Sequence, residues 1–377
     1  MQDFRRSARR RLAKPTGNTE VRPVNPALET LMLAFGPDSL PVPRKALFLG
    51  AEPHPDFKAW PAITGWQPFR PKASAWENAD LPLAATPDGK WPLILILPGK
   101  SRDETLLWFA TARDHLEPGG TIVVSMPNTA GAARFEKELG RAAANLTSIQ
   151  KHKCRAFHIV DDGSWNETIF DEWRSLGGKR PIPGTHFVTE AGIFSADHID
   201  PGSQLLAEHL PASLRGKIAD LGAGWGFLTD AVLKRCPGVG SVDLYEADSR
   251  ALDCARINLA DSGRGLANEG PLSLASSPCL LGDETRVGFH WHDVTTGLPE
   301  IYDAIVMNPP FHSGQTTDVD LGRAFLRTAC ASLRRGGKLL LVANRQLPYE
   351  AELTALGMPA RKLAEDSVYK ILSAERR

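Results

Sequence analysis

The chain has 377 residues, enough for two domains, and its 44 Lys and Arg residues balance 44 Asp and Glu residues to a formal net charge of zero. Global charge therefore does not predict a nucleic-acid partner, which would need local basic patches. The longest apolar run, residues 93–97, is too short to cross a membrane. The five scattered cysteines form neither a disulfide framework nor a metal-ligand pattern, so we predict a cytoplasmic protein without a metal site.

The first half of the chain consists of a basic tail and one predicted domain. Residues 1–25 are rich in Arg and lack an apolar signal core, so we expect a flexible tail. Residues 26–185 alternate apolar runs with helical stretches, which predicts a βαβ rhythm. The predicted strands are Ala46–Leu49, 93–97 and 121–124, and the predicted helix is 103–116. A stretch rich in Gly and Pro, residues 177–184, marks the predicted domain boundary.

The second half, residues 186–377, repeats this rhythm more clearly and predicts a second α/β domain. The predicted strands are 217–221, 242–245, 288–291, 304–307, 338–342 and 368–372, and the predicted helices are Phe227–Arg235, Ser249–Ala260 and 320–333. Residues 261–286 show no period, and we interpret them as an inserted loop.

The two halves resemble each other, which indicates a duplication. Three pairs of stretches correspond: residues 49–51 with 221–223, 91–98 with 302–309, and 116–124 with 333–341. The first half has Phe48 in place of Asp220 and Leu97 in place of Asn308. It therefore keeps the scaffold residues and lacks the polar ones. The alternative is that any two α/β domains look alike at this level.

The segment Asp220-Leu221-Gly222-Ala223-Gly224-Trp225-Gly226 follows a predicted strand and precedes a predicted helix. Its GxGxG spacing differs from the dinucleotide pattern, whose third glycine would fall at Phe227, and no Lys-Ser/Thr follows to make a phosphate loop. The glycines allow a ligand to approach the backbone closely. The negative charge of Asp220 disfavours a pyrophosphate and suits the ammonium group of S-adenosylmethionine.

Acidic residues follow the next two predicted strands. Glu246 ends one strand, where a carboxylate can accept hydrogen bonds from both hydroxyls of a ribose. Asp248 is the second candidate for that role, although it is also placed to cap the helix that follows. Asp293 follows the third strand and is placed to accept the adenine amino group, with a helix cap or solvated turn as the alternative.

Asn308-Pro309-Pro310-Phe311 follows the strand at 304–307 and points to one chemistry, the capture of a planar exocyclic amine. The side-chain carbonyl of Asn308 and the backbone carbonyl of Pro309 can accept its two N–H groups and direct its lone pair at an electrophile. The prolines stiffen the loop, and Phe311 offers a stacking face. His312 is expected to contact the substrate or pack, not to act as a base, because the amine becomes acidic once it has attacked.

The order of the glycine loop, the two acids and the residues 308–311 resembles class I S-adenosylmethionine-dependent methyltransferases, and more narrowly the bacterial ribosomal RNA guanine-N2 methyltransferases. Further similar stretches are residues 193–195, 200–206, 342–349 and 368–370. The resemblance implies two tandem Rossmann-like domains. Residues 26–185 would be degenerate and dock RNA, and residues 186–377 would be catalytic with a seven-stranded sheet.

The resemblance also implies the roles of individual residues. The cofactor-binding residues would be Asp220, Gly222, Ala223, Gly224, Glu246, Asp293 and Asn308. The catalytic residues would be Asn308, Pro309, Pro310 and Phe311, and the substrate contacts would be Phe311, His312, Phe194 and Gln204.

Three hypotheses remain from the sequence. The first is an enzyme that methylates the N2 amine of a guanine in ribosomal RNA or in a ribosomal particle, after the base leaves its stack. The second keeps this mechanism but takes adenine N6 or a protein glutamine amide. The third is a non-catalytic RNA-binding or ribosome-assembly protein, disfavoured because both the glycine loop and Asn308 are present. No membrane partner is expected.

Overall fold

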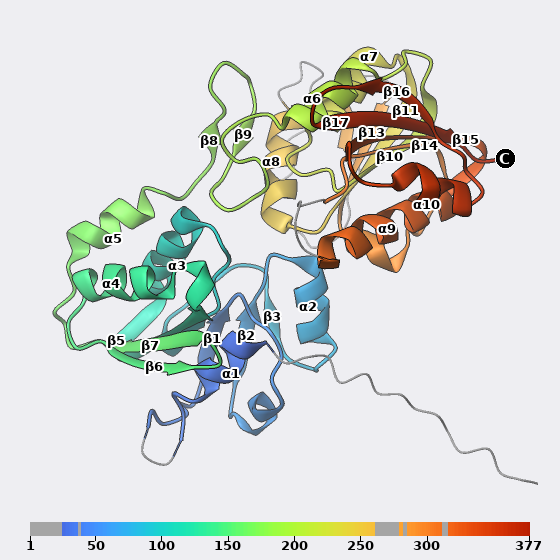
Figure 1. The fold of residues 1–377 in the computed structure, drawn as a ribbon. Helices are drawn as coiled ribbons and strands as arrows, with labels where there is room; N and C mark the ends of the chain where they lie inside the picture. Colours follow the sequence, from blue (N-terminus) through green and yellow to red (C-terminus); the bar gives the residue numbers. More distant parts are fainter. Residues whose placement is uncertain (1–24, 37–38, 261–278, 282–284, 311–315) are drawn as a thin grey trace, which may run out of the picture.

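The computed structural model describes residues 25–36, 39–260, 279–281, 285–310 and 316–377, so the predicted tail lies outside the described residues except for Asn25. The described residues form two lobes, each built on one twisted sheet with helices on both faces (Figure 1). This confirms the predicted α/β class with two tandem domains.

The sheet of the first lobe has seven strands in the order β3-β2-β1-β4-β5-β7-β6. β1, β2, β3, β4 and β5 run parallel, and β7 pairs antiparallel with both β5 and β6. The strands are β1 (Ala46–Leu49), β2 (Ile63–Trp66), β3 (Leu83–Ala84), β4 (Trp91–Ile96), β5 (Leu116–Pro127), β6 (Thr147–Lys151) and β7 (Cys154–Val160). One face packs on α3 (Arg102–His115), α4 (Ala132–Ala142) and α5 (Glu167–Arg174). The other packs on α1 (Pro26–Met32), η1 (Pro55–Ala59) and α2 (Arg70–Glu77).

The sheet of the second lobe repeats this order as β13-β11-β10-β14-β15-β17-β16 and adds one edge strand, β12, beside β13. The strands are β10 (Arg215–Leu221), β11 (Gly238–Glu246), β12 (Cys279–Leu281), β13 (Thr285–Trp291), β14 (Tyr302–Met307), β15 (Leu333–Asn344), β16 (Arg361–Glu365) and β17 (Tyr369–Glu375). The predicted seven strands are therefore present. The eighth comes from the segment that we interpreted as a loop.

Helices again cover both faces of the second sheet. One face packs on α6 (Pro201–Glu208), α7 (Phe227–Arg235) and α8 (Ser249–Ala260). The other packs on η3 (Val294–Thr296), α9 (Thr316–Ala331) and α10 (Tyr349–Ala355). Because β10, β11, β13 and β14 are parallel, their carboxyl ends meet at one edge, where ligands bind in open α/β sheets.

The duplication extends to the backbone that follows the first strand of each sheet. Gly50 and Ala51 both donate to the carbonyl of Trp66, at 2.9 and 3.2 Å, and Gly222 and Ala223 both donate to that of Tyr245, at 2.8 and 3.2 Å. Gly50 and Gly222 share a positive φ, +74° and +70°. In the first lobe, protein atoms occupy the space beside this glycine: a Cβ at Gly50 would lie 2.3 Å from the carbonyl oxygen of Leu97 and 2.8 Å from the Trp108 ring.

A two-stranded hairpin, β8 (Arg180–Pro181) and β9 (Val188–Thr189), connects the lobes, and the predicted boundary at residues 185 and 186 falls within it. Ile182 and Phe187 of this hairpin pack on Trp225, Ala251 and Cys254 of the second lobe.

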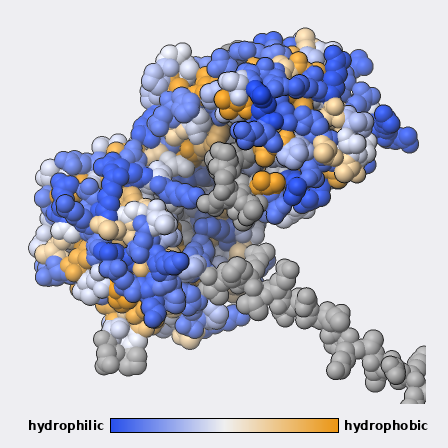
Figure 2. All heavy atoms as spheres, in the orientation of Figure 1, coloured by the Kyte–Doolittle hydropathy of each residue, from blue (hydrophilic) through white to orange (hydrophobic). Residues whose placement is uncertain are grey.

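The surface drawn in Figure 2 is mostly hydrophilic on both lobes, and hydrophobic residues form only small separate groups. Among the residues that the structure describes, no helix is long and apolar enough to span a membrane. Four described cysteines, Cys154, Cys236, Cys254 and Cys330, are buried and unbridged.

The crowding at Gly50 can be tested against Gly119, which shares its φ of +74° but has nothing within 4 Å of an added Cβ. We expect G119A to lower the free energy of unfolding by about 1–2 kcal/mol through backbone strain alone. G50A should cost roughly 1–3 kcal/mol more, because the added methyl group collides with Leu97 and Trp108. Urea denaturation of the two variants measures this, and equal losses would contradict the filled first-lobe pocket.

Candidate functional site

The glycine loop lies between β10 and α7, at the carboxyl edge of the second sheet. Gly222, Gly224 and Gly226 adopt φ values of +70°, +54° and +91°, which explains glycine at these positions. A Cβ at Gly224 would meet no atom within 4 Å, whereas one at Gly222 would lie 3.3 Å from Phe325. The loop is therefore supported on one side and has open space beside Gly224.

Asp220 lies beneath this loop and is completely buried. Its Oδ2 accepts a hydrogen bond from Thr229 Oγ1 at 2.7 Å, while its buried Oδ1 has no partner. Burial raises the pKa of the Asp220 carboxyl to about 7, and the negative charge of Glu246 adds to the effect. An unpartnered acceptor in this position fits the cationic donor that the sequence predicted, since a bound ammonium group would stabilise the carboxylate.

Glu246 ends β11 and lies beside the loop, partly exposed. Its Oε2 accepts from the Gly224 N–H and its Oε1 from the Asp248 N–H, both at 2.8 Å. Desolvation raises the pKa of Glu246 to about 7. Each oxygen can accept one further hydrogen bond, so the carboxylate fits the two hydroxyls of a ribose.

Asp248, the second candidate for the ribose, binds Arg250. Its two oxygens bind the guanidinium of Arg250 at 3.0 and 2.7 Å, and its Oδ1 also accepts from the backbone N–H of Arg250. The geometry therefore favours the alternative interpretation of Asp248, a cap that precedes α8.

Asp293 caps η3, since its Oδ1 accepts from the backbone N–H of Thr295 at 2.9 Å and from its hydroxyl at 2.6 Å. The capping alternative is therefore present. Its Oδ2 has no hydrogen-bond donor among the described residues, so a role toward adenine stays a prediction.

Asn308 follows β14, and its side-chain amide is fixed by α6. Its Nδ2 donates to Asp200 Oδ2 at 2.9 Å and to Ser203 Oγ at 2.7 Å, which uses both of its hydrogens. Asp200 is the N-cap of α6 and also accepts from the Ser203 N–H at 2.7 Å. Within the described part of the chain no group donates to Asn308 Oδ1, so this oxygen is available as an acceptor.

No role was predicted for Asp200 from the sequence, although a signal was present. Asp200-Pro201 is an N-cap followed by a proline in the first turn, and Ser203 stands where the cap receives its backbone hydrogen bond. These residues are distant from Asn308 in the sequence, so only the fold shows that they contact it.

The remaining predicted site residues lie in different surroundings. Pro309 is buried and Pro310 partly buried, while Phe311 and His312 lie outside the described residues. Phe194 is 55% exposed, beside Ser195 with a φ of +52°. Gln204 is exposed, and its Nε2 donates to Glu208 one turn along α6 at 3.4 Å. The structure therefore brings Ser203, not Gln204, to Asn308, because Gln204 projects from another side of the helix.

The family model for the methyltransferase small domain matches residues 184–270 and 271–373, half of the chain. The chain belongs to this methyltransferase family. The curated relatives include ribosomal RNA small subunit methyltransferase C of Shewanella loihica, 31% identical over 262 residues that span 68% of this chain and 69% of that protein. The protein of the same name from Psychromonas ingrahamii is 28% identical over 286 residues, 75% of this chain and 76% of that protein.

A solved structure shares the complete two-lobed fold. It is the T. thermophilus 16S rRNA N2 G1207 methyltransferase in complex with AdoMet and guanosine, matched with a TM-score of 0.73 and 22% identity over 94% of this chain and 92% of that chain. The arrangement of two methyltransferase-like domains is therefore a fold of this family.

The anchoring of Asn308 predicts a specific defect in D200A. The variant loses an acceptor of the Asn308 amide, so we expect kcat for methyl transfer to fall by about 10- to 100-fold, with little change in the affinity for S-adenosylmethionine. The control is N25A, which removes the N-cap of α1 in the other lobe and should leave kcat unchanged. A D200A enzyme with the kcat of N25A would contradict the orienting role.

The raised pKa of Asp220 predicts a pH dependence of stability. The unfolded carboxyl ionises near pH 4 and the folded one near pH 7, so the unfolded state binds fewer protons between these values. The Asp220 contribution should therefore disfavour folding increasingly as pH rises from 4 to 7 and then level off. D220N, whose amide oxygen can still accept from Thr229, should gain stability relative to wild type at pH 8 but little at pH 4.5. Denaturation curves at these two pH values measure the difference, and a pH-independent difference would contradict the assignment.

Proposed function

We propose that this chain transfers a methyl group from S-adenosylmethionine to the exocyclic N2 amine of a guanine in small-subunit ribosomal RNA. One observation carries the proposal: the amide of Asn308 is held by Asp200 and Ser203 so that its carbonyl oxygen remains free, at the carboxyl edge of a methyltransferase sheet. The guanine specificity is supported by the relatives named ribosomal RNA small subunit methyltransferase C and by the stretches that resemble guanine-N2 methyltransferases.

The residues of the loop hold the amine in a reactive geometry. The Asn308 Oδ1 and the Pro309 carbonyl accept the two N–H groups of the amine, which favours tetrahedral character at nitrogen and directs the lone pair away from the ring. Pro309 and Pro310 restrict the backbone, so these acceptors are preorganised. No strong base is needed, since the amine proton becomes acidic after methylation and passes to water.

The cofactor supplies the electrophilic methyl group, and the chain supplies a matching set of contacts. Asp220 would accept from the ammonium group, Glu246 from the ribose hydroxyls and Asp293 from the adenine amino group. Gly222, Ala223 and Gly224 would give the backbone surface that these groups approach. The unpartnered Oδ1 of Asp220 and the open space at Gly224 support this placement.

Two basic stretches are candidates for RNA contacts. Lys151, His152 and Lys153 are exposed at the turn between β6 and β7, beside the carboxyl end of β5. Arg334 and Arg335 lie at the start of β15, beside the start of β14 and therefore at the other edge of the sheet from Asn308. We assign RNA docking to the turn at 151–153 of the first lobe, because it lies at the carboxyl edge of its sheet, and expect the enzyme to act in the cytoplasm.

The test is transfer of labelled methyl from S-adenosylmethionine to ribosomal RNA and subunits from a strain lacking this gene, followed by nucleoside analysis. We expect label in N2-methylguanosine of the small-subunit RNA. Label in N6-methyladenosine, or in protein glutamine, would overturn the substrate while keeping the mechanism.

Variants of Asn308 separate an enzyme from a binding protein. N308A should reduce methyl transfer by at least about 100-fold, because the amine loses its side-chain acceptor, while RNA binding persists. The matched control is S203A, which leaves the Asp200 bond to Asn308 and should cost much less. Unchanged transfer by N308A would contradict the proposed role of the loop.

A further inference from the structure

The two lobes contact each other through equivalent segments. Trp66 and Tyr245 occupy the same register position, opposite Leu49 and Leu221, so residues 67–70 correspond to residues 246–249. Phe69 and Asp248 form an antiparallel bridge. The Arg70 N–H donates to the Ala247 carbonyl at 2.7 Å, and the Ser249 N–H donates to the Pro68 carbonyl at 3.0 Å. These two hydrogen bonds are related by an approximate two-fold axis between the lobes.

Trp291 of β13 contributes a third hydrogen-bond donor to this contact. Its Nε1–H is shared between the carbonyls of Pro68 and Ala247, each at 2.8 Å, so it binds one residue from each lobe. The Arg70 guanidinium lies 4.8 Å from the centre of the Trp291 ring. Residues 67–70, residues 246–249 and Trp291 together form the interlobe bridge.

The interlobe bridge also fixes the side chains of Glu246, which ends β11, and of Gln67, which follows β2. On the second lobe, the Asp248 N–H binds Glu246 Oε1 at 2.8 Å. On the first lobe, the Phe69 N–H binds Gln67 Oε1 at 3.1 Å, while Gln67 Nε2 donates to the Ala51 carbonyl at 3.0 Å. Phe69 and Asp248 are the paired residues, so the N–H groups that hold Gln67 and Glu246 belong to the bridge itself.

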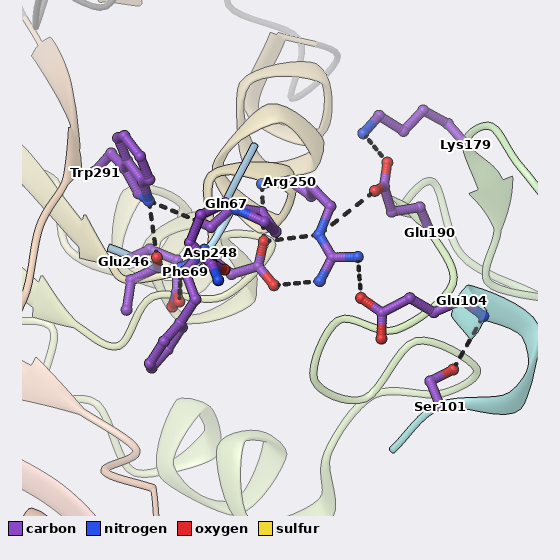
Figure 3. A network of polar contacts seen from close by, with 12 residues as sticks. Gln67, Phe69, Ser101, Glu104, Lys179, Glu190, Glu246, Asp248, Arg250 and Trp291 are labelled. Carbon is purple, nitrogen blue, oxygen red and sulfur yellow. Dashed lines mark hydrogen bonds and ion pairs between the residues drawn. The ribbon is translucent and has the colours of Figure 1, made fainter. Parts of the chain in front are cut away.

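Side chains form a second connection between the lobes, through Asp248 of the interlobe bridge (Figure 3). Arg250 binds both oxygens of Asp248 and places its Nη1 2.6 Å from Glu104 Oε1, on α3 of the first lobe. Glu104 is 5% exposed, and its burial raises the pKa of its carboxyl. It is also closely packed, since a Cβ at Gly192 would lie 2.6 Å from its carboxyl carbon. The position of Asp248 is therefore set by both the backbone and the side chains of the first lobe.

We infer that the first lobe is a positioning element for the cofactor acid: the interlobe bridge holds the Asp248 N–H, which holds the Glu246 carboxylate in its ribose-binding position. The inference rests on the proposed function, in which Glu246 binds the ribose of S-adenosylmethionine. It assigns Arg70, Trp291, Glu104 and Arg250 as positioning residues and not as cofactor contacts. It also gives the degenerate lobe a second task besides RNA docking.

The backbone bond of Arg70 can be removed by substitution with proline. Arg70 is the first residue of α2 and follows the extended Phe69, a position at which a helix accepts proline. R70P deletes the N–H and places the proline Cδ against the Ala247 carbonyl, 2.7 Å from the nitrogen, so it opens this end of the bridge. R70A removes the same side chain and keeps the N–H, which makes it the matched reference. By calorimetry on the full chain, R70P should bind S-adenosylmethionine at least about threefold more weakly than R70A, because at least one net hydrogen bond is lost.

Two further measurements separate positioning from a general loss of structure. E246Q should weaken binding less in the R70P background than in the R70A background, because both changes act on one contact. At saturating cofactor, R70P and R70A should share the same kcat. W291F, which keeps an aromatic ring but lacks the shared N–H, should reproduce the weaker binding if R70P fails to fold.

The outcomes distinguish this inference from the proposed function. Equal affinities of R70P, R70A and W291F, or strictly additive effects with E246Q, overturn the positioning role while E246Q alone still weakens binding. If the wild type does not bind S-adenosylmethionine, or E246Q leaves binding unchanged, the assignment of Glu246 fails and the positioning inference fails with it.

Discussion

The carboxylate of Glu246 is the contact on which the organisation of the site depends. It joins the glycine loop, through the Gly224 N–H, to the segment that follows β11, through the Asp248 N–H. Desolvation opposes its ionisation, as its raised pKa shows, so the two N–H donors offset part of the cost of placing a charge there. A ligand with two hydroxyl groups would complete the set of hydrogen bonds that the protein supplies only in part.

The two lobes show how one scaffold carries different chemistry. The strand order, the glycine turn after the first strand and its two hydrogen bonds to the second strand are the same in both. The side chains differ at the three positions where the second lobe places polar groups: Phe48 for Asp220, Gln67 for Glu246 and Leu97 for Asn308. Gln67 even keeps the hydrogen bond from the residue two positions on, so the loss of charge left the local geometry intact.

Local sequence patterns predicted the strands and helices next to the glycine loop and Asn308, but not α6, whose Asp200 and Ser203 hold the Asn308 amide. The spacing of apolar residues predicted Phe227–Arg235 and Ser249–Ala260 with the observed bounds, since each helix begins directly after a recognisable loop. The glycine loop and Asn308 were found because their residue types are fixed by chemistry at single positions. The strands at the antiparallel edges, β6 and β16, were missed because their residues are largely exposed and give no apolar run. The strands β2, β3 and β7 were not predicted either.

The contacts that orient the site could not be predicted, because they join residues far apart in the chain. Asp200 and Asn308 are separated by 108 positions, and Glu104 and Arg250 by 146. Asp200 and Asp248 both precede helices and both read as ordinary N-caps. Only the fold shows that the Asp200 carboxylate also accepts a hydrogen bond from the Asn308 amide, whereas the Asp248 carboxylate forms an ion pair with Arg250.

The register of the interlobe bridge follows from a residue that lacks a donor. The bridge uses the carbonyl of Pro68 and the N–H of Arg70, and the next residue, Pro71, has no N–H. A shift by one residue that centred the bridge on Arg70 would need a donor at position 71 and would leave the Ala247 carbonyl without its backbone partner. Pro71 therefore opposes this displacement of the first lobe, which would also change the contact that holds the Asp248 backbone.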